Sequence, residues 1–371
     1  MLRSLYPTDA PDVQRQVVAQ AVRHAARPGG TGLVFTSLHL PEDDRLVEHG
    51  ELLRRLHAGH GLTFCGDVSP LTLERLGGGE GALDRLRDWG VTVLRIDFGF
   101  DVEEIRRIAE RTGARIAVNA STVQAAELDA LAGLPLAGWH NYYPRPETGL
   151  STATYRAQDA LFTARDLPLY AFVPGEVTFR APLGLGLPTL EEQRHRTVWR
   201  NYLQLRRLSP GSTLVCAEGV VQDDHLAWIE RHEDTGEVTV PLSGVDPAAR
   251  FLLDRPWRLR VDSGEVAFRL EGTRGERTPS HLRNGDTRAR GSLQMDLPGA
   301  GRYQGEVSLV RADRPLHPWQ ARVADVAPPY VGVVDELRPG DTVRFVPDAA
   351  AGAAGTGAAG TGTAAVSGRA G

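Results

Sequence analysis

The sequence predicts an α/β fold in which a (β/α)8 TIM barrel is followed by a small all-β domain. Three observations lead to this prediction. Eight apolar, strand-like runs alternate with helical patterns over about 235 residues counted from Leu2. Polar residues follow almost every one of these runs, which is where a barrel places its active site. Beyond about Val240, helical periodicity gives way to short strands separated by Gly, Pro, Asp and Asn.

The predicted barrel strands are continuous apolar runs, as in a parallel sheet covered on both faces. They are Leu2–Tyr6, Leu33–Thr36, Leu62–Cys65, Val91–Ile96, Arg115–Val118, Leu136–Trp139, Leu169–Val173 and Thr213–Ala217. Helices are expected between them, for example at Val13–Ala26, Arg45–His57, Val102–Arg111 and Thr122–Leu131, the first starting at Asp9-Ala10-Pro11. A doubly wound open sheet is the rival fold. It would ordinarily carry a glycine fingerprint after its first strand, and this chain has none there.

We therefore divide the chain into a barrel at residues 1–240, a β domain at 241–347 and a disordered Ala/Gly/Thr tail at 348–371. The β domain is expected to contain seven strand-like runs. They are Phe251–Leu253, Trp257–Val261, Val266–Leu270, Gly291–Met295, Glu306–Val310, Gln320–Val326 and Thr342–Val346.

Composition excludes several classes of function. The net charge is −5, and without a basic face a nucleic-acid partner is not expected. The sequence contains no Lys, which excludes Schiff-base chemistry. No signal peptide or membrane-spanning window is recognised, and the two cysteines read as buried thiols, so a cytoplasmic location is expected. No cluster with metal-ligand spacing is found, and neither a metal nor another cofactor is predicted.

Two polar segments have structural interpretations. The most basic stretch, Arg194–Arg207, follows two glutamates on one predicted helix, and a solvated helix face is its expected role. Thr189 and Glu192 have the spacing of a capping box at the start of that helix.

Four acidic residues lie at predicted strand ends: Asp67, Asp97, Glu176 and Glu218. Several uncompensated carboxylates around one pocket raise some of their pKa values, so that one can donate a proton while another stays ionised. The loop Ala137–Ser151 adds aromatic, amide and imidazole groups, a composition typical of a glycosidase site. Its rings, including Trp139, are candidates for stacking on sugar faces.

The sequence resembles the 6-phospho-N-acetylmuramidase family of peptidoglycan recycling. The resemblance rests on TSLHLPEDD (Thr36–Asp44), DVSP (Asp67–Pro70), LRIDFGF (Leu94–Phe100), NAST (Asn119–Thr122), WHNYYPRPETGLS (Trp139–Ser151) and the segment from FVPGE to Glu191. GRYQGEVSL (Gly301–Leu309) and LRPGD (Leu337–Asp341) resemble the cyclophilin-like C-terminal domain of that family. The chain departs from the family pattern at Glu176, Ala181 and Leu185.

The resemblance implies hydrolysis of the β-1,4 bond of 6-phospho-N-acetylmuramyl-N-acetylglucosamine or a related anionic amino-sugar disaccharide. Asp97 and Glu176 are predicted as the catalytic pair, with Asp67 in reserve. Neither role is assigned, and an N-acetyl group acting as internal nucleophile stays open. Predicted substrate-binding residues are His39, Arg95, Asn119, His140, Asn141, Tyr142, Tyr143, Arg145, Glu147, Arg180 and Glu218, with Arg145 and Arg180 favoured for a phosphate or carboxylate.

Two other functions stay open. The protein is alternatively a different barrel enzyme acting on phosphorylated sugars, or a carbohydrate-binding sensor that has lost turnover, for which Leu185 is the one hint. The expected partner is a small sugar or sugar phosphate, with neither nucleic acid nor a membrane involved. The β domain is expected either to close the barrel mouth or to form a homodimer.

Overall fold

The computed structural model describes residues 1–38, 45–96, 99–262, 264–279 and 287–348. The chain forms two compact units, Met1–Ile229 and Glu230–Gly371. The second unit begins within helix α9 (Asp223–Thr235), and its first strand starts at Val238.

The first unit is the predicted barrel. Its eight strands are parallel neighbours in the order in which they occur in the chain, and a bridge between Leu2 and Val215 joins the last strand to the first. Hydrogen bonds from Leu2 N to Leu214 O (2.8 Å) and from Cys216 N to Leu2 O (3.0 Å) secure that junction. The strands are β1 (Arg3–Ser4), β2 (Leu33–Ser37), β3 (Thr63–Val68), β4 (Val91–Ile96), β5 (Arg115–Asn119), β6 (Leu136–Trp139), β7 (Leu169–Val173) and β8 (Thr213–Cys216).

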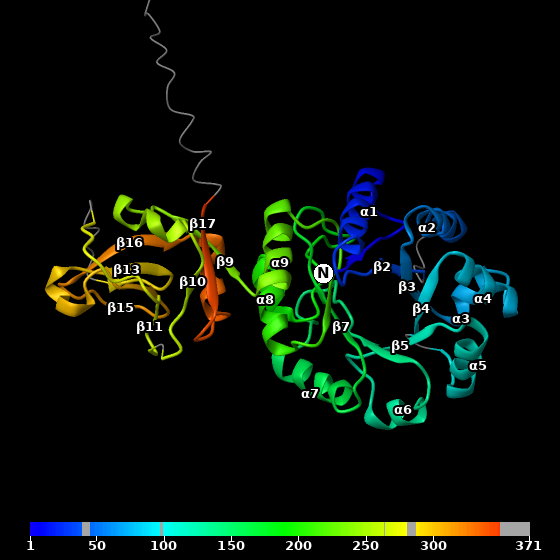
Figure 1. Ribbon diagram of the computed structural model, residues 1–371. Coiled ribbons are helices and arrows are strands. Elements are labelled where there is room, and N and C mark those ends of the chain that lie inside the picture. Colours follow the sequence, from blue (N-terminus) through cyan, green and yellow to red (C-terminus); the bar gives the residue numbers. More distant parts are fainter. Residues whose placement is uncertain (39–44, 97–98, 263, 280–286, 349–371) are drawn as a thin grey trace, which may run out of the picture. The chain divides into compact units, whose positions relative to one another are not determined.

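Helices lie around the outside of these strands (Figure 1). Helix α5 illustrates why: Asp101 and Glu104 form a capping box at its start, and Gly113 ends it with a positive φ. Its buried residues are Ile105, Ile108 and Ala109, which are spaced three and four positions apart and therefore lie on one face of the helix. The other barrel helices are α1 (Pro11–Ala25), α2 (Leu46–His60), α3 (Pro70–Arg75), α4 (Gly79–Asp88), α6 (Ala125–Ala130), α7 (Thr152–Thr163) and α8 (Val198–Leu208).

The interior of the barrel is an aromatic core. Trp139 is fully buried and stacks on Tyr170 with ring centroids 4.2 Å apart. Phe35 also stacks on the Trp139 ring, with centroids 5.6 Å apart, and meets Phe172 edge-on at 5.0 Å. Such rings contribute large buried area and favourable pair geometry. The expectation that Trp139 stacks on a sugar is therefore wrong, because its ring fills the core.

The second unit is a curled, mixed β domain. Its main sheet has the order β10-β17-β9-β16-β13-β14-β11, in which only the β17–β9 pair is parallel. Phe251–Leu253, expected as a strand, lies instead in the 3-10 helix η2 (Pro247–Leu253), because Asp246 accepts a hydrogen bond from Ala248 N and Pro247 starts the turn. The strands are β9 (Val238–Ser243), β10 (Trp257–Arg258), β11 (Ala267–Arg269), β13 (Ser292–Asp296), β14 (Val307–Val310), β16 (Gln320–Val326) and β17 (Thr342–Pro347), with β12 (Thr287–Arg288) and β15 (Arg314–Pro315) forming a separate pair.

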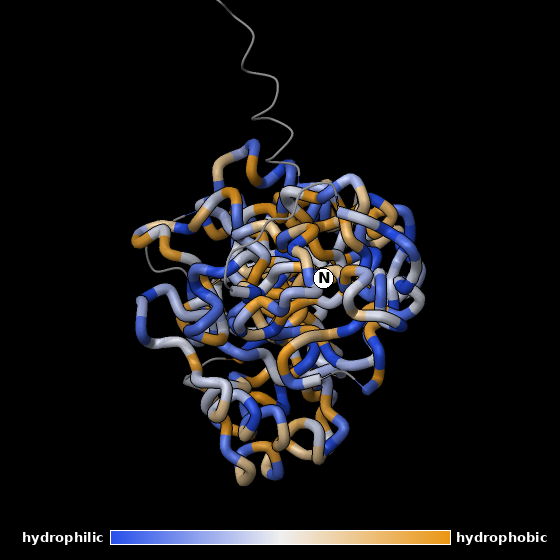
Figure 2. The backbone as a smooth tube through the Cα atoms, turned by 90° about the vertical axis from the view of Figure 1, so that its left-hand side faces the viewer, coloured by the Kyte–Doolittle hydropathy of each residue, from blue (hydrophilic) through white to orange (hydrophobic). Residues whose placement is uncertain are grey.

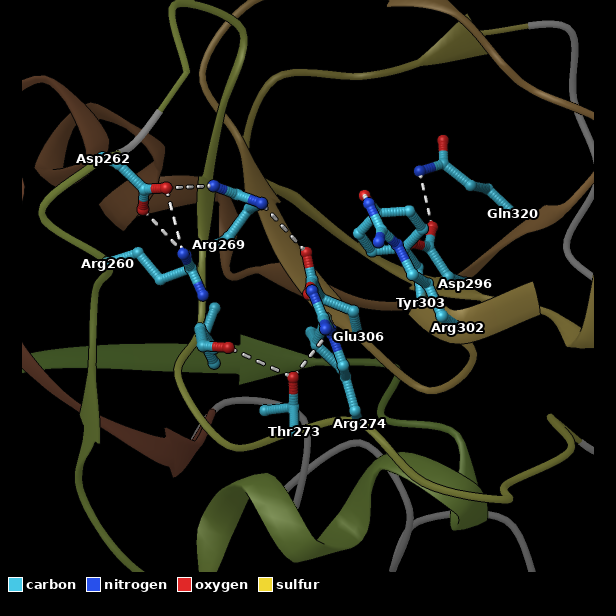
Figure 3. Close-up of polar contacts among 12 residues, drawn as sticks. Arg260, Asp262, Arg269, Thr273, Arg274, Asp296, Arg302, Tyr303, Glu306 and Gln320 are labelled. Atoms are coloured by element: carbon cyan, nitrogen blue, oxygen red, sulfur yellow. Dashed lines mark hydrogen bonds and ion pairs between the residues drawn. The ribbon is translucent and has the colours of Figure 1, made fainter. Parts of the chain in front are cut away.

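One side of this sheet is polar. Glu306 is buried and accepts hydrogen bonds from Arg274 (2.6 Å) while Arg269 lies 3.6 Å away (Figure 3). Gln320 bonds Asp296 across the neighbouring strands at 2.8 Å. Both arginines are partly exposed, so each ion pair contributes about 0–1 kcal/mol and mainly fixes side-chain positions.

Hydropathy changes over short distances along the chain, and Figure 2 shows hydrophobic segments interrupted by hydrophilic ones. Within the described ranges, none of the helices combines the length and the apolar character that crossing a membrane requires.

Candidate active site

Asp67 and Arg95 form a buried ion pair at the C-terminal end of the barrel strands. They are directly opposite each other on β3 and β4, and Arg95 Nη1 lies 2.8 Å from Asp67 Oδ1. Their side chains are only 13% and 4% exposed, respectively. Arg95 also donates through Nη2 to the side-chain oxygen of Asn141. The guanidinium charge offsets that of the carboxylate, so the pair as a whole is neutral and holds the Asp67 carboxylate in a fixed position.

Tyr142 and Arg180 extend this network across the mouth. Arg180 Nη1 donates to the Tyr142 hydroxyl at 3.3 Å, and its guanidinium lies 4.2 Å above the centre of the Tyr6 ring. Burial, followed by the charge of Asp67, raises the pKa of Tyr142. Tyr142 is therefore a neutral hydrogen-bonding group between the cation and the carboxylate.

Glu218, which follows β8, is the second carboxyl in this region. It is 1% exposed, and its Oε2 accepts a hydrogen bond from Arg180 N at 2.6 Å. Its Oε1 is buried and has no hydrogen-bond partner within the described part of the chain. Burial raises the pKa of Glu218 to about 7. Hydrogen bonds from the N–H groups of Arg180, Gly175 and Leu187 lower the pKa but do not offset the effect of burial. This carboxyl can therefore hold a proton near neutral pH, whereas the Asp67 carboxylate is paired with the guanidinium of Arg95.

Glu176 has a different environment. Its carboxylate accepts from Val198 N at 3.1 Å and from Gln222 N at 3.3 Å, at the start of α8 and just before α9. The same group lies 2.5 Å from Nδ1 of His225, a buried residue of α9. These contacts engage both carboxylate oxygens with the helical layer. Glu176 is thus held by the helical layer, and its predicted pairing with Asp97 stays a prediction, because Asp97 lies outside the described residues.

The loop after β6 is fixed by a buried arginine. Arg194 donates to both oxygens of Glu191 at 2.6 Å and to the carbonyls of Tyr143 (2.9 Å), Gly186 (2.9 Å) and Arg145 (3.1 Å). The expected solvated face is thus wrong for Arg194, which is 4% exposed and precedes α8.

The expected capping box at Thr189 and Glu192 is also wrong. Helix α8 begins only at Val198, with Thr197 as its cap. Thr189 instead donates to Asn141 O at 2.9 Å and accepts from Phe172 N at 2.9 Å, which ties the loop after β6 to β7. Polar spacing alone could not reveal that this segment crosses back to another strand.

His140 is a structural residue of this loop. It is fully buried, stacks on Tyr155 at 4.6 Å, and has Nδ1 3.1 Å from Ser121 Oγ. Burial lowers its pKa to about 3, so the imidazole is neutral. Ser121 Oγ also accepts from Asn141 N at 2.9 Å, and Asn119 Oδ1 accepts from Ser121 N at 3.0 Å. His140 and Asn119 therefore orient the backbone that presents Asn141.

The remaining predicted residues differ in exposure. Tyr143 is half-buried, whereas Arg145 and Glu147 are exposed further along the loop, Glu147 with a φ of 67°. His39 and Asp97 lie outside the described residues. For Asp97 the catalytic role stays a prediction.

Sequence reasoning missed Tyr6 and Asp9. Tyr6 follows β1 as the other site residues follow their strands, a signal that was available. Asp9 was read as a helix start, but Ala10 occupies the cap position and Asp9 accepts from Tyr6 N at 3.0 Å. Burial raises the pKa of Asp9 to about 6.

The strand ends of this (β/α)8 barrel carry an arginine-paired carboxylate and a buried carboxyl of raised pKa beside phenols, an amide and a guanidinium. These are the kinds of groups that glycoside hydrolysis uses. Residues 3–230 match the N-terminal domain of the 6-phospho-N-acetylmuramidase family. The chain belongs to this family and is a glycosidase.

Two solved structures share the fold along nearly their whole lengths. One is a conserved protein of unknown function from Enterococcus faecalis, 24% identical, with a TM-score of 0.78 over 94% of this chain and 96% of that one. The other is an uncharacterised B. cereus protein, 20% identical, with a TM-score of 0.71 over 93% and 98% of the two chains. These likenesses support the two-part architecture. None of the curated proteins matches the chain.

Proposed function

We propose that this protein hydrolyses the β-1,4 bond of 6-phospho-N-acetylmuramyl-N-acetylglucosamine, or of a closely related phosphorylated amino-sugar disaccharide. Family membership supports the glycosidase class, and the family name supports a 6-phosphorylated muramyl sugar as substrate. Arg180 at the mouth supplies a cation suited to an anionic sugar.

The observation that carries the proposal is the contrast between two carboxyls. Asp67 is paired with the guanidinium of Arg95, whereas burial raises the pKa of Glu218 to about 7, so that Glu218 holds a proton below that pH. Glycoside hydrolysis needs this combination: an acid that protonates the leaving oxygen and a carboxylate that stabilises positive charge at the anomeric carbon.

The proposed chemistry follows from these states. Glu218 donates its proton through Oε1 to the glycosidic oxygen as the bond from that oxygen to the anomeric carbon breaks. The ionised Asp67 stabilises the oxocarbenium-like transition state, and water adds its oxygen to the anomeric carbon while its proton returns to the carboxylate of Glu218. Tyr142 and Asn141, each bonded to an arginine of the mouth, orient the sugar hydroxyl and N-acetyl groups.

The test is hydrolysis of the phosphorylated disaccharide and of its unphosphorylated twin by wild type, Glu218→Gln, Asp67→Asn and Asp97→Asn. We expect cleavage of the phosphorylated sugar, with kcat reduced at least about 100-fold by Glu218→Gln and by Asp67→Asn. Glu192→Gln, at an exposed carboxylate of the helical layer, is the control and should keep full activity. Tight binding without cleavage by the wild type would instead indicate a sensor. Normal turnover by Glu218→Gln would overturn the assignment of the acid.

A further inference from the structure

The β domain carries an exposed aromatic ring that has no role in the chemistry described so far. Trp319 lies in the turn before β16, and 43% of its surface is exposed. Tryptophan is usually well buried, so this exposure calls for a physical reason. Within the described part of the β domain, Val261 is the only other large hydrophobic side chain that is exposed, and it follows β10, three strands away from β16 in the sheet. An isolated ring of this kind does not form the extended apolar patch that a protein partner requires.

The neighbours of Trp319 fix the position of its ring. His317 stacks on the indole with ring centroids 4.9 Å apart and planes 2° from parallel, so it covers one face. The Trp319 carbonyl accepts a hydrogen bond from Leu297 N at 2.7 Å. Gly299 lies beside the base of the side chain, where a Cβ would be 3.5 Å from Trp319 Cβ, and it has no side chain to extend over the ring. The indole is therefore held in place and still presents an open area.

Planar polar groups lie next to this ring. Asp296 and Gln320 are paired across β13 and β16, and Gln320 Nε2 donates to Asp296 Oδ1 at 2.8 Å (Figure 3). Arg288 Nη1 donates to Gln320 Oε1 at 3.2 Å. Burial raises the pKa of Asp296, while the hydrogen bond from Gln320 and the charges of Arg288 and His317 oppose this shift. His317 therefore lies close both to the ring of Trp319 and to the carboxyl. Within the described residues, the other carboxyl oxygen, Asp296 Oδ2, accepts no hydrogen bond.

This combination suits an uncharged sugar ring. The face of an indole is the negative end of its quadrupole, and the C–H groups on the face of a pyranose are weakly positive, so the two surfaces attract each other. Sugar hydroxyls both donate and accept, and a carboxylate, an amide and a guanidinium offer them acceptors and donors in fixed planes. Asp296 and Arg288 carry opposite charges, so the surface offers no unbalanced cation to a phosphorylated molecule.

We propose that the β domain binds an uncharged pyranose on a surface formed by Trp319, Asp296, Gln320 and Arg288, which we call the Trp319 surface. The indole stacks on the sugar ring, and Asp296 Oδ2 accepts hydrogen bonds from its hydroxyls. Arg288 donates through the N–H groups that are not used for Gln320 and for the carbonyl of Pro315. The surface belongs to the second unit and takes part in no bond cleavage, so it does not rest on the proposed function.

NMR titration of the isotope-labelled full chain with the β-1,4-linked dimer of N-acetylglucosamine observes this surface directly. The indole N–H signal of Trp319 is identified by its absence from the spectrum of Trp319→Phe, and the side-chain amide signals of Gln320 by their absence from that of Gln320→Glu. We expect both sets of signals to shift and to saturate with one Kd of about 1–10 mM, a weak affinity that fits a shallow surface. Glycerol, which has hydroxyls and no ring face, and inorganic phosphate should shift neither.

Matched variants separate stacking from general effects on the surface. Followed at the Gln320 amide, Trp319→Ala should weaken sugar binding at least about fivefold, whereas Trp319→Phe keeps an aromatic face and should weaken it less than about threefold. Asp296→Asn keeps the shape of the side chain and removes its charge, and it should weaken binding at least about threefold. Val261→Ala, at the other exposed hydrophobic side chain, is the control and should leave the Kd unchanged.

Unshifted Trp319 and Gln320 signals, or equal effects of Trp319→Ala and Val261→Ala, would overturn the proposal. Shifts produced by phosphate in place of the sugar would indicate an anion site, and shifts produced by raising the protein concentration alone would indicate a contact between copies of the chain. Either result would refute sugar binding. Sugar-dependent shifts without hydrolysis of the phosphorylated disaccharide would retain the Trp319 surface and refute the proposed function, and hydrolysis without these shifts would do the reverse.

Discussion

Replacing Arg194 by methionine should both destabilise the barrel and impair turnover, although Arg194 itself is not proposed to contact the substrate. Its side chain is 2% exposed and satisfies the Glu191 carboxylate together with three loop carbonyls. Methionine has a similar apolar stem and no donors. Arg194→Met therefore removes the cation from the Glu191 carboxylate, which keeps the hydrogen bond from Gly149 N at 2.8 Å, and it removes the donor from three carbonyls.

The size of the effect follows from burial. Removing one partner of a buried ion pair costs about 3–5 kcal/mol, because the other charge stays behind unpaired. Glu191 is 29% exposed, so water recovers part of that cost and we expect about 3 kcal/mol. Arg196→Met is the matched control: Arg196 pairs with Glu192, the two side chains are 24% and 39% exposed, and about 0–1 kcal/mol is expected.

Urea denaturation of both variants measures the free energies of unfolding, and kcat/KM reports the position of the loop that carries Asn141 and Tyr142. The free energy of unfolding measured at acid pH provides a further readout. The hydrogen bonds from Arg194 lower the pKa of Glu191 from 4.5 to about 2. A depressed carboxyl pKa stabilises the fold above pH 4.5, and this contribution is lost as pH falls toward 2. Arg194→Met should show a smaller acid-dependent loss, because the backbone hydrogen bonds from Glu147 and Gly149 still lower the pKa of Glu191. Equal destabilisation by Arg194→Met and Arg196→Met would refute the reasoning.

Three further results are expected. The activity of the wild type should fall as pH rises through about 7, where Glu218 loses its proton, and its stability should decline as pH rises from 4.5 to about 7. Glu218→Gln should remove the decline in stability between about pH 6 and 7, whereas the raised pKa of Asp9 should maintain a decline up to about pH 6; an unchanged decline between pH 6 and 7 in this variant would contradict the assignment. Asp9→Asn should lower the KM for the phosphorylated disaccharide at pH 8, because the ionised Asp9 near Arg180 opposes an anionic sugar. Kinetics at pH 5 and 8 check this, and an unchanged KM at pH 8 would count against it. Glu176→Gln should lower thermal stability, because the contact of the carboxylate with His225 is weakened, and should keep kcat within about threefold of the wild type. A loss of turnover comparable with that of Glu218→Gln would instead indicate that Glu176 belongs to the catalytic pair.

The alternating pattern of the sequence was enough to predict the barrel. Three predicted strands, Val91–Ile96, Leu136–Trp139 and Leu169–Val173, have the observed bounds. The reason is physical: strands buried on both faces are continuous apolar runs, and they end where polar residues reach the rim. The β domain was predicted less well, because a short apolar run such as Phe251–Leu253 has no period that separates a strand from a 3-10 turn.

The site was only partly predictable. Asp67, Glu176 and Glu218 all follow apolar strands, yet Glu176 contacts the helices while the other two lie with the residues of the mouth. Sequence position indicates the end of a strand but not the direction of a side chain beyond it. Arg194 was misread for a related reason: its partners Tyr143 and Gly186 are distant in sequence, and charge patterning considers only neighbours on one element.

Arg180 connects the proposed acid step to the recognition of the phosphorylated sugar. Its backbone N–H donates to the Glu218 carboxyl, and its guanidinium donates to the Tyr142 hydroxyl. A substrate phosphoryl group bound to Arg180 would neutralise the guanidinium and place negative charge near Glu218. Both effects disfavour the ionised carboxyl, so the bound substrate would keep Glu218 protonated at a pH where the free enzyme has begun to lose that proton. Phosphate recognition would then contribute to the acid step itself, because the group that marks the substrate also holds the catalytic proton in place.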